Sequence, residues 1–161
     1  MAGFPEITQE DFDSFEALLR DYVVRNGVTL AVFVHRAGPL LSYWGEVERQ
    51  NVEVIATLAS NAYTAGESLI RDRFADRSFS SVTLNGENFS GMVMGVDEHS
   101  LLLVVFKTTL NPGSVRSTSL PAVLKLRERM REARARNPDA SYDLVDENKP
   151  NVSDVFKKKQ P

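Results

Sequence analysis

Two histidines and the acidic residues beside one of them are the first side chains in this sequence that could do chemistry. His35 and His99 each lie near the end of a predicted strand, and Asp97 and Glu98 directly precede His99. Imidazole and carboxylate groups are common zinc ligands. However, adjacent residues on a tight turn cannot all point inward, and no second cluster supplies further ligands. We therefore interpret residues 97–99 as a polar turn and predict no metal site.

The motifs of common enzyme classes are missing from the sequence. The P-loop pattern G-x-x-x-x-G-K-[S/T] does not occur, and the glycines of "GMVMG" lack the spacing of a dinucleotide-binding turn and open no helix. No serine lies in a nucleophile-elbow pattern. We therefore predict that the protein is not an enzyme, that it has no catalytic residues and that it needs no cofactor.

The composition is typical of a globular protein. The 161 residues are 42% hydrophobic and 25% charged, carry a formal net charge of -3 and include no cysteine, which fits a reducing compartment. No apolar run reaches the roughly 20 residues of a membrane helix. The acidic start "MAGFPEITQEDF" lacks the layout of a signal peptide. We predict a cytoplasmic protein without membrane insertion.

A basic cluster near the end of the last predicted helix leaves nucleic-acid binding open as an alternative. Its members are Lys125, Arg127, Arg129, Arg131, Arg134 and Arg136. Few aromatic residues are interleaved with them, and basic residues late in a helix also complement the helix dipole. The first predicted helix is acidic, so the two helices would offset each other's charge if they lie side by side. We favour this interpretation and expect no nucleic-acid partner.

The hydrophobic periodicity predicts eight elements that position these residues. A helix over 8–26 begins with a capping-box pattern, Thr8 with Asp11. Strands follow at 28–35 and 40–45, a helix at 51–75, and strands at 78–84, 89–96 and 100–106. The last strand is nearly continuously apolar and is predicted to be central. The final helix starts before or at Pro121. This order predicts an α+β fold in which helices sandwich a five-stranded antiparallel sheet.

Residues 8–136 are predicted to form the single domain, and residues 137–161 a flexible C-terminal tail. Within the tail, Val152, Val155 and Phe156 have the spacing of one helical turn. One interpretation is that this turn docks on a groove. The alternative is a solvated end with incidental hydrophobic residues.

The middle helix divides into three sectors when each residue advances by about 100°. The sector expected to face the sheet holds Ile55, Leu58, Ala62, Ala65 and Leu69. A second apolar sector holds Ala56, Ala59, Tyr63, Gly66 and Ile70, which are expected at a homodimer interface, and Phe74 near its end. The third, expected to bind a partner, holds Thr57, Ser60, Asn61, Thr64 and Ser68, with Glu67 and Arg71 near its rim. The alternative is that the second sector packs on the protein's own helix or loop and that the polar side is simply solvated.

The sequence resembles the roadblock/dynein-light-chain family, most closely its bacterial MglB-type members, over residues 8–136. The resemblance rests on "GVTLAVFVHRAGPLLSYWG", "IATLASNAYTAGESLIRDRF", "SLLLVVF" and "TTLNPGSVR". It departs at Asn61, where close relatives tend to have glycine, and at Pro121. The resemblance implies a single roadblock-like, homodimeric domain in which middle helices pair and sheets join edge to edge.

The resemblance also implies a partner, a small Ras-like (MglA-type) GTPase with bound GTP, which lies across the paired helices. MglB-type members activate such a GTPase in bacterial cell polarity and motility by shifting its own loops, without an arginine finger. Arg71, Arg73 or Arg116 in a finger role is a minor hypothesis. One alternative is a non-catalytic adaptor that binds GTPases or polarity proteins without stimulating hydrolysis. Another is a small-molecule sensor with a pocket between sheet and helix.

Overall fold

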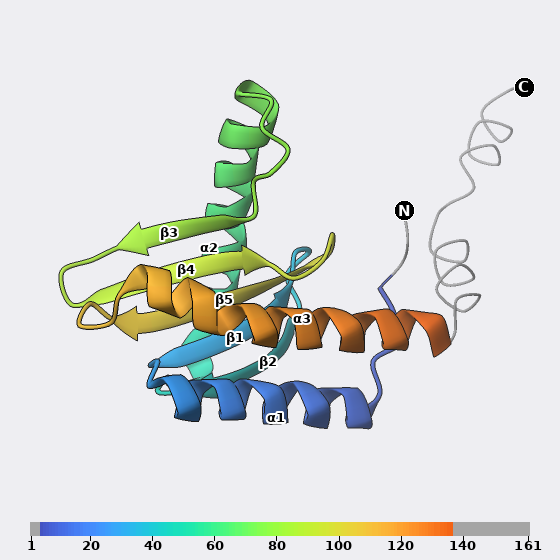
Figure 1. The fold of residues 1–161 in the computed structure, drawn as a ribbon. Helices are drawn as coiled ribbons and strands as arrows, with labels where there is room; N and C mark the ends of the chain where they lie inside the picture. Colours follow the sequence, from blue (N-terminus) through green and yellow to red (C-terminus); the bar gives the residue numbers. More distant parts are fainter. Residues whose placement is uncertain (1–3, 137–161) are drawn as a thin grey trace, which may run out of the picture.

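The computed structural model describes residues 4–136 and shows helices on both faces of one sheet (Figure 1). The elements are α1 Gln9–Asn26, β1 Leu30–His35, β2 Leu40–Gly45, α2 Arg49–Glu67, η1 Ser68–Arg73, β3 Ser81–Asn85, β4 Phe89–Gly95, β5 Ser100–Lys107 and α3 Pro112–Arg136. The predicted element order is confirmed, with the addition of the short helix η1. The predicted docking residues Val152, Val155 and Phe156 lie outside the described residues.

The sheet has the strand order β2-β1-β5-β4-β3, and every neighbouring pair is antiparallel. This confirms the predicted α+β fold with a five-stranded antiparallel sheet. β5 is the central strand, as its apolar run predicts. β2 and β3 form the two edges of the sheet, and an edge strand carries backbone groups that a further strand can pair with.

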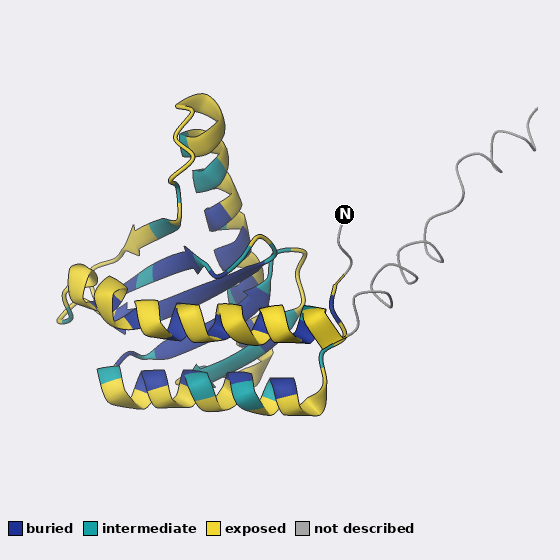
Figure 2. Cartoon of the chain, turned by 45° about the vertical axis from the view of Figure 1, so that its right-hand side comes forward, coloured by how far each residue is buried: buried dark blue, intermediate teal, exposed yellow. Residues whose placement is uncertain are grey.

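The two faces of the sheet carry separate hydrophobic cores. α1 and α3 lie side by side over one face, where Phe15 of α1 and Met130 of α3 meet Phe33 and Phe106 of the sheet (Figures 1 and 2). α2 covers the other face, where its buried residues meet Val32, Leu101 and Leu103. The domain therefore has three layers, with the sheet in the middle.

The start of α1 and the end of α3 are joined through one carboxylate. Asp11 Oδ2 accepts a hydrogen bond from the backbone N–H of Thr8 at 2.9 Å, which completes the predicted capping box. Asp11 Oδ1 also accepts a hydrogen bond from Arg136 Nη1 at 3.0 Å. The Arg136 hydrogen bond is the main cause of the lowered pKa of Asp11. This contact supports the prediction that the acidic and basic helices offset each other.

The last helix starts well before its internal proline. α3 begins at Pro112 and includes Pro121, so the earlier of the two predicted starts is correct. Proline lacks the N–H that would bond to the carbonyl four residues before it. Nearby hydroxyls bond to carbonyls of the same turns: Thr118 donates to the Ser114 carbonyl at 2.9 Å and Ser119 to the Arg116 carbonyl at 2.9 Å.

The two apolar sectors of α2 are reversed relative to the prediction. Leu58 and Leu69, expected to face the sheet, are 61% and 53% exposed. Ala56, Ala59 and Tyr63, expected to meet a second copy, are instead buried against the protein's own sheet. These three are therefore not available at a surface, and the corresponding part of the predicted dimer interface is wrong.

The reason for the reversal lies in the shape of the sheet face. Val32, Leu101 and Leu103 project from the strands toward α2. The small side chains of Ala56 and Ala59 let the helix backbone approach these bulky residues closely, which keeps the packing dense. The bulk of Leu58 and Leu69 is then left on the outer side of the helix.

Gly66 also belongs to the intramolecular contact. A Cβ atom at Gly66 would lie 2.5 Å from Cγ2 of Val82 and 3.2 Å from Cζ of Phe79. The glycine therefore allows α2 to approach the chain before and within β3, instead of a second helix as predicted. Ile70, the last member of the predicted interface, lies in η1 and is half-buried.

Candidate interaction surface

An exposed apolar stripe runs along the outer side of α2 and continues into η1. We define the apolar stripe as Val54, Leu58, Ala65 and Leu69, all exposed, with half-buried Ile55 and Ala62 beside them. Their spacing follows one side of a helix. Large exposed aliphatic side chains aligned on one helix face are a feature of interaction sites.

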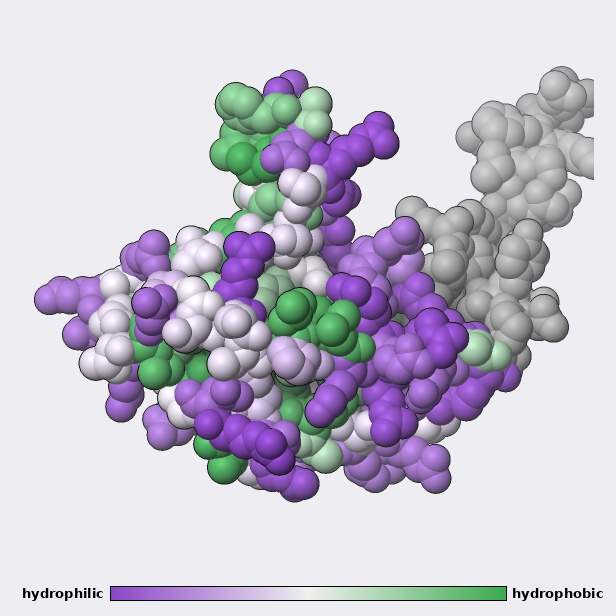
Figure 3. All heavy atoms as spheres, in the orientation of Figure 1, coloured by the Kyte–Doolittle hydropathy of each residue, from purple (hydrophilic) through white to green (hydrophobic). Residues whose placement is uncertain are grey.

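The stripe leads to a projecting end of the molecule. The end of α2 and η1 extend beyond the sheet, and residues there are mostly exposed (Figures 1 and 2). η1 is one turn of π-helix, a geometry found often at functional sites. It is followed by Phe74, which is 72% exposed, and by Ala75, whose φ of 56° turns the chain back. Figure 3 shows hydrophobic residues gathered at this projecting end.

An apolar groove connects the stripe to the edge strand β3. The groove has a volume of about 350 Å³ and lies between α2 and the β3–β4 hairpin. Leu58 lines it from the helix, and Leu84 and Phe89, which are both about half exposed, line it from the hairpin. β3 pairs only with β4 among the described residues, so its outer edge is open. Stripe, groove and open edge thus form one continuous surface.

A polar stripe lies beside the apolar one on α2. We define it as Thr57, Asn61, Thr64 and Ser68, which are all exposed as predicted. The Thr57 hydroxyl donates a hydrogen bond to the Glu53 carbonyl at 3.0 Å, so part of its polarity is used within the helix. Short uncharged side chains lose little conformational entropy when they are covered by a partner.

Two residues predicted for this surface are engaged inside the protein. Ser60 is buried, and its hydroxyl donates a hydrogen bond to the Arg36 carbonyl at 3.1 Å. Glu67 is partly buried and accepts a hydrogen bond from Arg36 Nη2 at 2.8 Å. Arg71 lies 3.3 Å from the same carboxylate. Ser60 and Glu67 therefore support the surface from below, while Arg71 remains exposed at its rim.

Arg36 is a residue that the sequence reasoning missed. It follows β1 and reaches the projecting part of α2, where its guanidinium lies 5.1 Å from the centre of the Tyr63 ring. The hydrogen bond from Arg36 is the main cause of the lowered pKa of Glu67. Because Arg36 and Glu67 are 31 residues apart, no local pattern in the sequence indicates this contact. It holds the projecting end of the helix against the sheet.

The histidines and the acidic turn have structural partners. Asp97 Oδ1 accepts hydrogen bonds from the His99 backbone N–H and the Ser100 hydroxyl, both at 2.8 Å, which supports the polar-turn interpretation. The rings of His35 and His99 are stacked with centroids 6.1 Å apart. Burial is the main cause of the lowered pKa of His35. Within residues 4–136, no three metal-binding side chains are grouped as a metal site would require.

A helix that spans a membrane must be both long and apolar. Within residues 4–136, no helix combines the length and the apolar character needed to cross a bilayer.

A family model identifies the class of domain to which this fold belongs. The chain belongs to the Roadblock/LC7 family, because the Roadblock/LC7 domain model matches residues 14–106, more than half of its length. No curated protein matches the sequence. The family resemblance inferred from the sequence is thereby confirmed.

Within this class, the chain is similar to solved MglB structures. One is described as MglB with tetrameric arrangement, with 20% identity, a TM-score of 0.73, and coverage of 83% of this chain and 99% of that chain. Myxococcus xanthus MglB has 19% identity, a TM-score of 0.72, and coverage of 80% and 96%. The gliding protein MglB of Thermus thermophilus has 20% identity, a TM-score of 0.70, and coverage of 82% and 99%. At these identities the similarity establishes the fold.

Proposed function

We propose that this protein is a homodimeric regulator of a small Ras-like GTPase, and that it activates GTP hydrolysis in the manner of MglB-type proteins. The observation that carries the proposal is the exposed surface on α2, where an apolar stripe and a polar stripe lie side by side. Family membership and the similarity to MglB structures support the same assignment.

In this proposal two copies pair through the apolar stripe and the outer edge of β3. Leu58, Leu69, Leu84 and Phe89 would be covered by the second copy, and the free backbone groups of the two β3 edges would bond to each other. A two-fold arrangement is the commonest symmetry of soluble oligomers and uses the same patch on both copies. This assignment replaces the predicted interface, whose members Ala56, Ala59 and Tyr63 are buried within one chain.

The GTP-bound GTPase would lie on the polar stripes of the two paired helices. Thr57, Asn61, Thr64 and Ser68 face solvent next to the dimer contact, so pairing would place two such stripes together. Arg71 stands at the rim of this platform.

Activation would occur by moving the GTPase's own loops and not by a donated arginine. An arginine finger must be free to reach the transferred phosphate, where it accelerates hydrolysis about 10³- to 10⁵-fold. Arg71 is already ion-paired with Glu67. Arg73 and Arg116 are exposed, and an arginine-finger role for either of them is a minor hypothesis. Replacement of each by alanine should leave the stimulated rate of hydrolysis nearly unchanged.

The test is single-turnover GTP hydrolysis by a small Ras-like GTPase from the same genome. Addition of the protein should increase the hydrolysis rate in a saturable way and should yield a complex with the GTP-bound form. A complex with unchanged hydrolysis would select the adaptor function. Absence of both acceleration and complex formation would refute the regulatory function altogether.

A further inference from the structure

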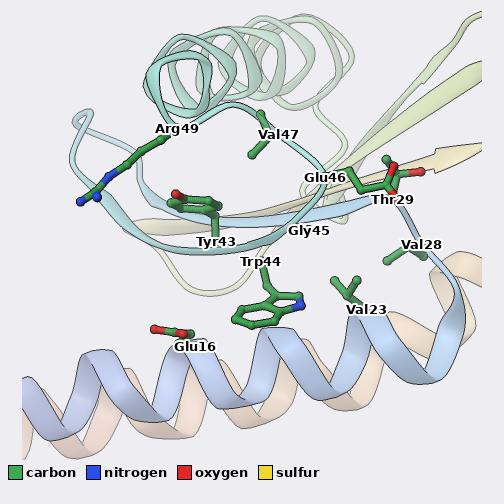
Figure 4. A pocket seen from close by; sticks show the side chains of 10 residues that line it. All are labelled: Glu16, Val23, Val28, Thr29, Tyr43, Trp44, Gly45, Glu46, Val47 and Arg49. Carbon is green, nitrogen blue, oxygen red and sulfur yellow. The ribbon is translucent and has the colours of Figure 1, made fainter.

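A second groove lies at the β2 edge of the sheet, opposite the edge that contains β3. Its main cavity has a volume of about 730 Å³ and lies between α1, β2 and the connection from β2 to α2 (Figure 4). The cavity wraps around the edge of β2: Trp44, Val23 and Val28 line it on the α1 side, and Tyr43 and Val47 line it on the α2 side. Cavities of this size bind peptides and small ligands in many proteins.

The cavity continues along β2 toward the start of α1. A smaller cavity of about 200 Å³ shares Glu16 and Tyr43 with the first one and adds Phe12, Leu40 and Leu41. We call the two cavities together the β2 groove. β2 pairs only with β1 among the described residues, so its outer edge can bond to an extended segment. Neither the proposed dimer contact nor the proposed GTPase platform uses this groove.

The charges around the β2 groove are mainly negative. Glu16 and Glu46 line the main cavity. Glu48 and Glu53 line an adjoining hollow that shares Arg49 with the main cavity. The other nearby cation, Arg20, is held over the Trp44 ring at 5.6 Å from its centre. An occupant that suits this groove is extended, has an aromatic or aliphatic anchor, and carries several positive charges.

The chain itself contains a segment of this composition beyond the described residues. Residues 155–159 read Val-Phe-Lys-Lys-Lys, an aromatic anchor followed by three consecutive cations. We propose that this segment binds in the β2 groove of its own chain. In this arrangement Phe156 packs beside Trp44 on the α1 side of β2, and the lysines pass the strand edge toward Glu46, Glu48 and Glu53.

The end of α3 is suitably placed for this contact. Arg136 is hydrogen-bonded to Asp11 in the first turn of α1, next to Phe12 and one turn before Glu16, where the β2 groove begins. From Asp11 to Val23, at the far part of the groove, α1 rises about 18 Å at 1.5 Å per residue. Phe156 lies 20 positions after Arg136, and such a segment can span at most about 65–70 Å when fully extended. The distance is therefore well within reach.

Trp44 provides a direct test because it is the only tryptophan of the sequence and lines the groove. We would measure acrylamide quenching of its fluorescence in the full chain, in Phe156→Ser, and in a variant with Lys157→Glu, Lys158→Glu and Lys159→Glu. Both variants should increase the quenching constant about twofold, with unchanged far-UV circular dichroism. Lys149→Glu, a single substitution of the same kind outside residues 155–159, should have no effect. Equal quenching in all four proteins would refute the proposal.

A crosslink gives a second, independent test, since the sequence has no cysteine of its own. A Glu46→Cys/Lys157→Cys double variant should form a disulfide within one chain under mild oxidation, which requires Cα atoms within about 7 Å. The control is the double variant Glu98→Cys/Lys157→Cys. Glu98 is also exposed, and it is adjacent to Asp97, whose carboxylate lies 3.7 Å from Arg134 near the end of α3. Position 98 is at least as easy for the segment to reach as position 46. If the β2 groove binds the segment, disulfide formation should therefore be much weaker at position 98.

The remaining outcomes of the crosslink also decide the matter. Disulfides that join two chains would show that the groove takes the segment of a second copy, and would overturn the same-chain proposal. Equal bridging at both sites, or none, would overturn it as well. The result is independent of the GTPase assay, since the groove lies at the other edge of the sheet from the surface proposed for pairing.

Discussion

Replacement of Leu58 by Glu should weaken the pairing of two copies and leave the fold intact. Leu58 is 61% exposed in the single chain and lines the groove beside β3, so it supports neither hydrophobic core. In the proposed dimer it would become buried. Full burial of a leucine side chain stabilises by about 1.5–3 kcal/mol, so covering the exposed part contributes about 1–2 kcal/mol.

The loss of association free energy is twice this value for the dimer, because each copy contributes one Leu58. Loss of both contacts corresponds to about 2–4 kcal/mol, which raises the dissociation constant of the dimer about 30- to 1,000-fold. The introduced carboxylates add to this loss, since a buried unpaired charge is unfavourable. Sedimentation equilibrium over a concentration series measures the constant for the wild-type protein and the variant, and thermal unfolding checks that the monomer remains folded.

Leu124→Glu is the matched control. Leu124 is 50% exposed, but it lies on α3, which covers the opposite face of the sheet. The same substitution there should leave the dissociation constant unchanged. If Leu58→Glu pairs as tightly as the wild-type protein, or if Leu124→Glu weakens pairing equally, the apolar stripe is not the contact between copies.

Two further substitutions test the support of this surface from within the chain. Gly66→Leu should destabilise the folded monomer by about 1–3 kcal/mol through overpacking against Val82, as measured by urea unfolding. If stability is unchanged but the two copies no longer pair, Gly66 lies at the dimer contact instead. Glu67→Gln should lower stability by about 1 kcal/mol at pH 7, because the carboxylate then no longer pairs with Arg36 and Arg71. Since the pKa of Glu67 is lowered in the folded state, its stabilisation is complete above the ordinary value of 4.5 and is lost as the pH falls through the lowered pKa. The stability difference between the wild-type protein and Glu67→Gln should therefore shrink under acidic conditions, and a difference that is constant with pH would contradict the ion-pair explanation.

The element order was predictable because each element carries its own signal. The capping pattern at Thr8 and Asp11, the glycine that follows α1, and the apolar run of β5 are all local features. Hydrophobic periodicity also separated the exposed polar residues Thr57, Asn61, Thr64 and Ser68 from the apolar sides of α2. These features depend only on residues that are close in sequence.

The orientation of α2 was not predictable in the same way, because it depends on residues far away in the chain. Periodicity shows that two sides of a helix are apolar, but the bulky sheet face decides which side fits. That face includes Leu101 and Leu103, more than 30 residues after α2. Likewise, Ser60 and Glu67 were predicted at the partner surface, but both form hydrogen bonds with Arg36, which precedes them by 24 and 31 residues. A polar residue on the predicted partner-binding side of a helix can thus form hydrogen bonds within its own chain instead of binding a partner.

The most direct test of the regulatory function is GTP hydrolysis with a substitution at Thr64. Thr64 lies in the middle of the polar stripe and is exposed, so Thr64→Arg should obstruct the GTPase without disturbing the fold or the dimer. Ser117→Arg, at an exposed position of α3 over the opposite face, serves as the control. We predict that the wild-type protein and Ser117→Arg stimulate GTP hydrolysis by a small Ras-like GTPase from the same genome equally, and that with Thr64→Arg the hydrolysis stays at its intrinsic rate. Full stimulation by Thr64→Arg would contradict the assignment of α2 as the regulatory surface.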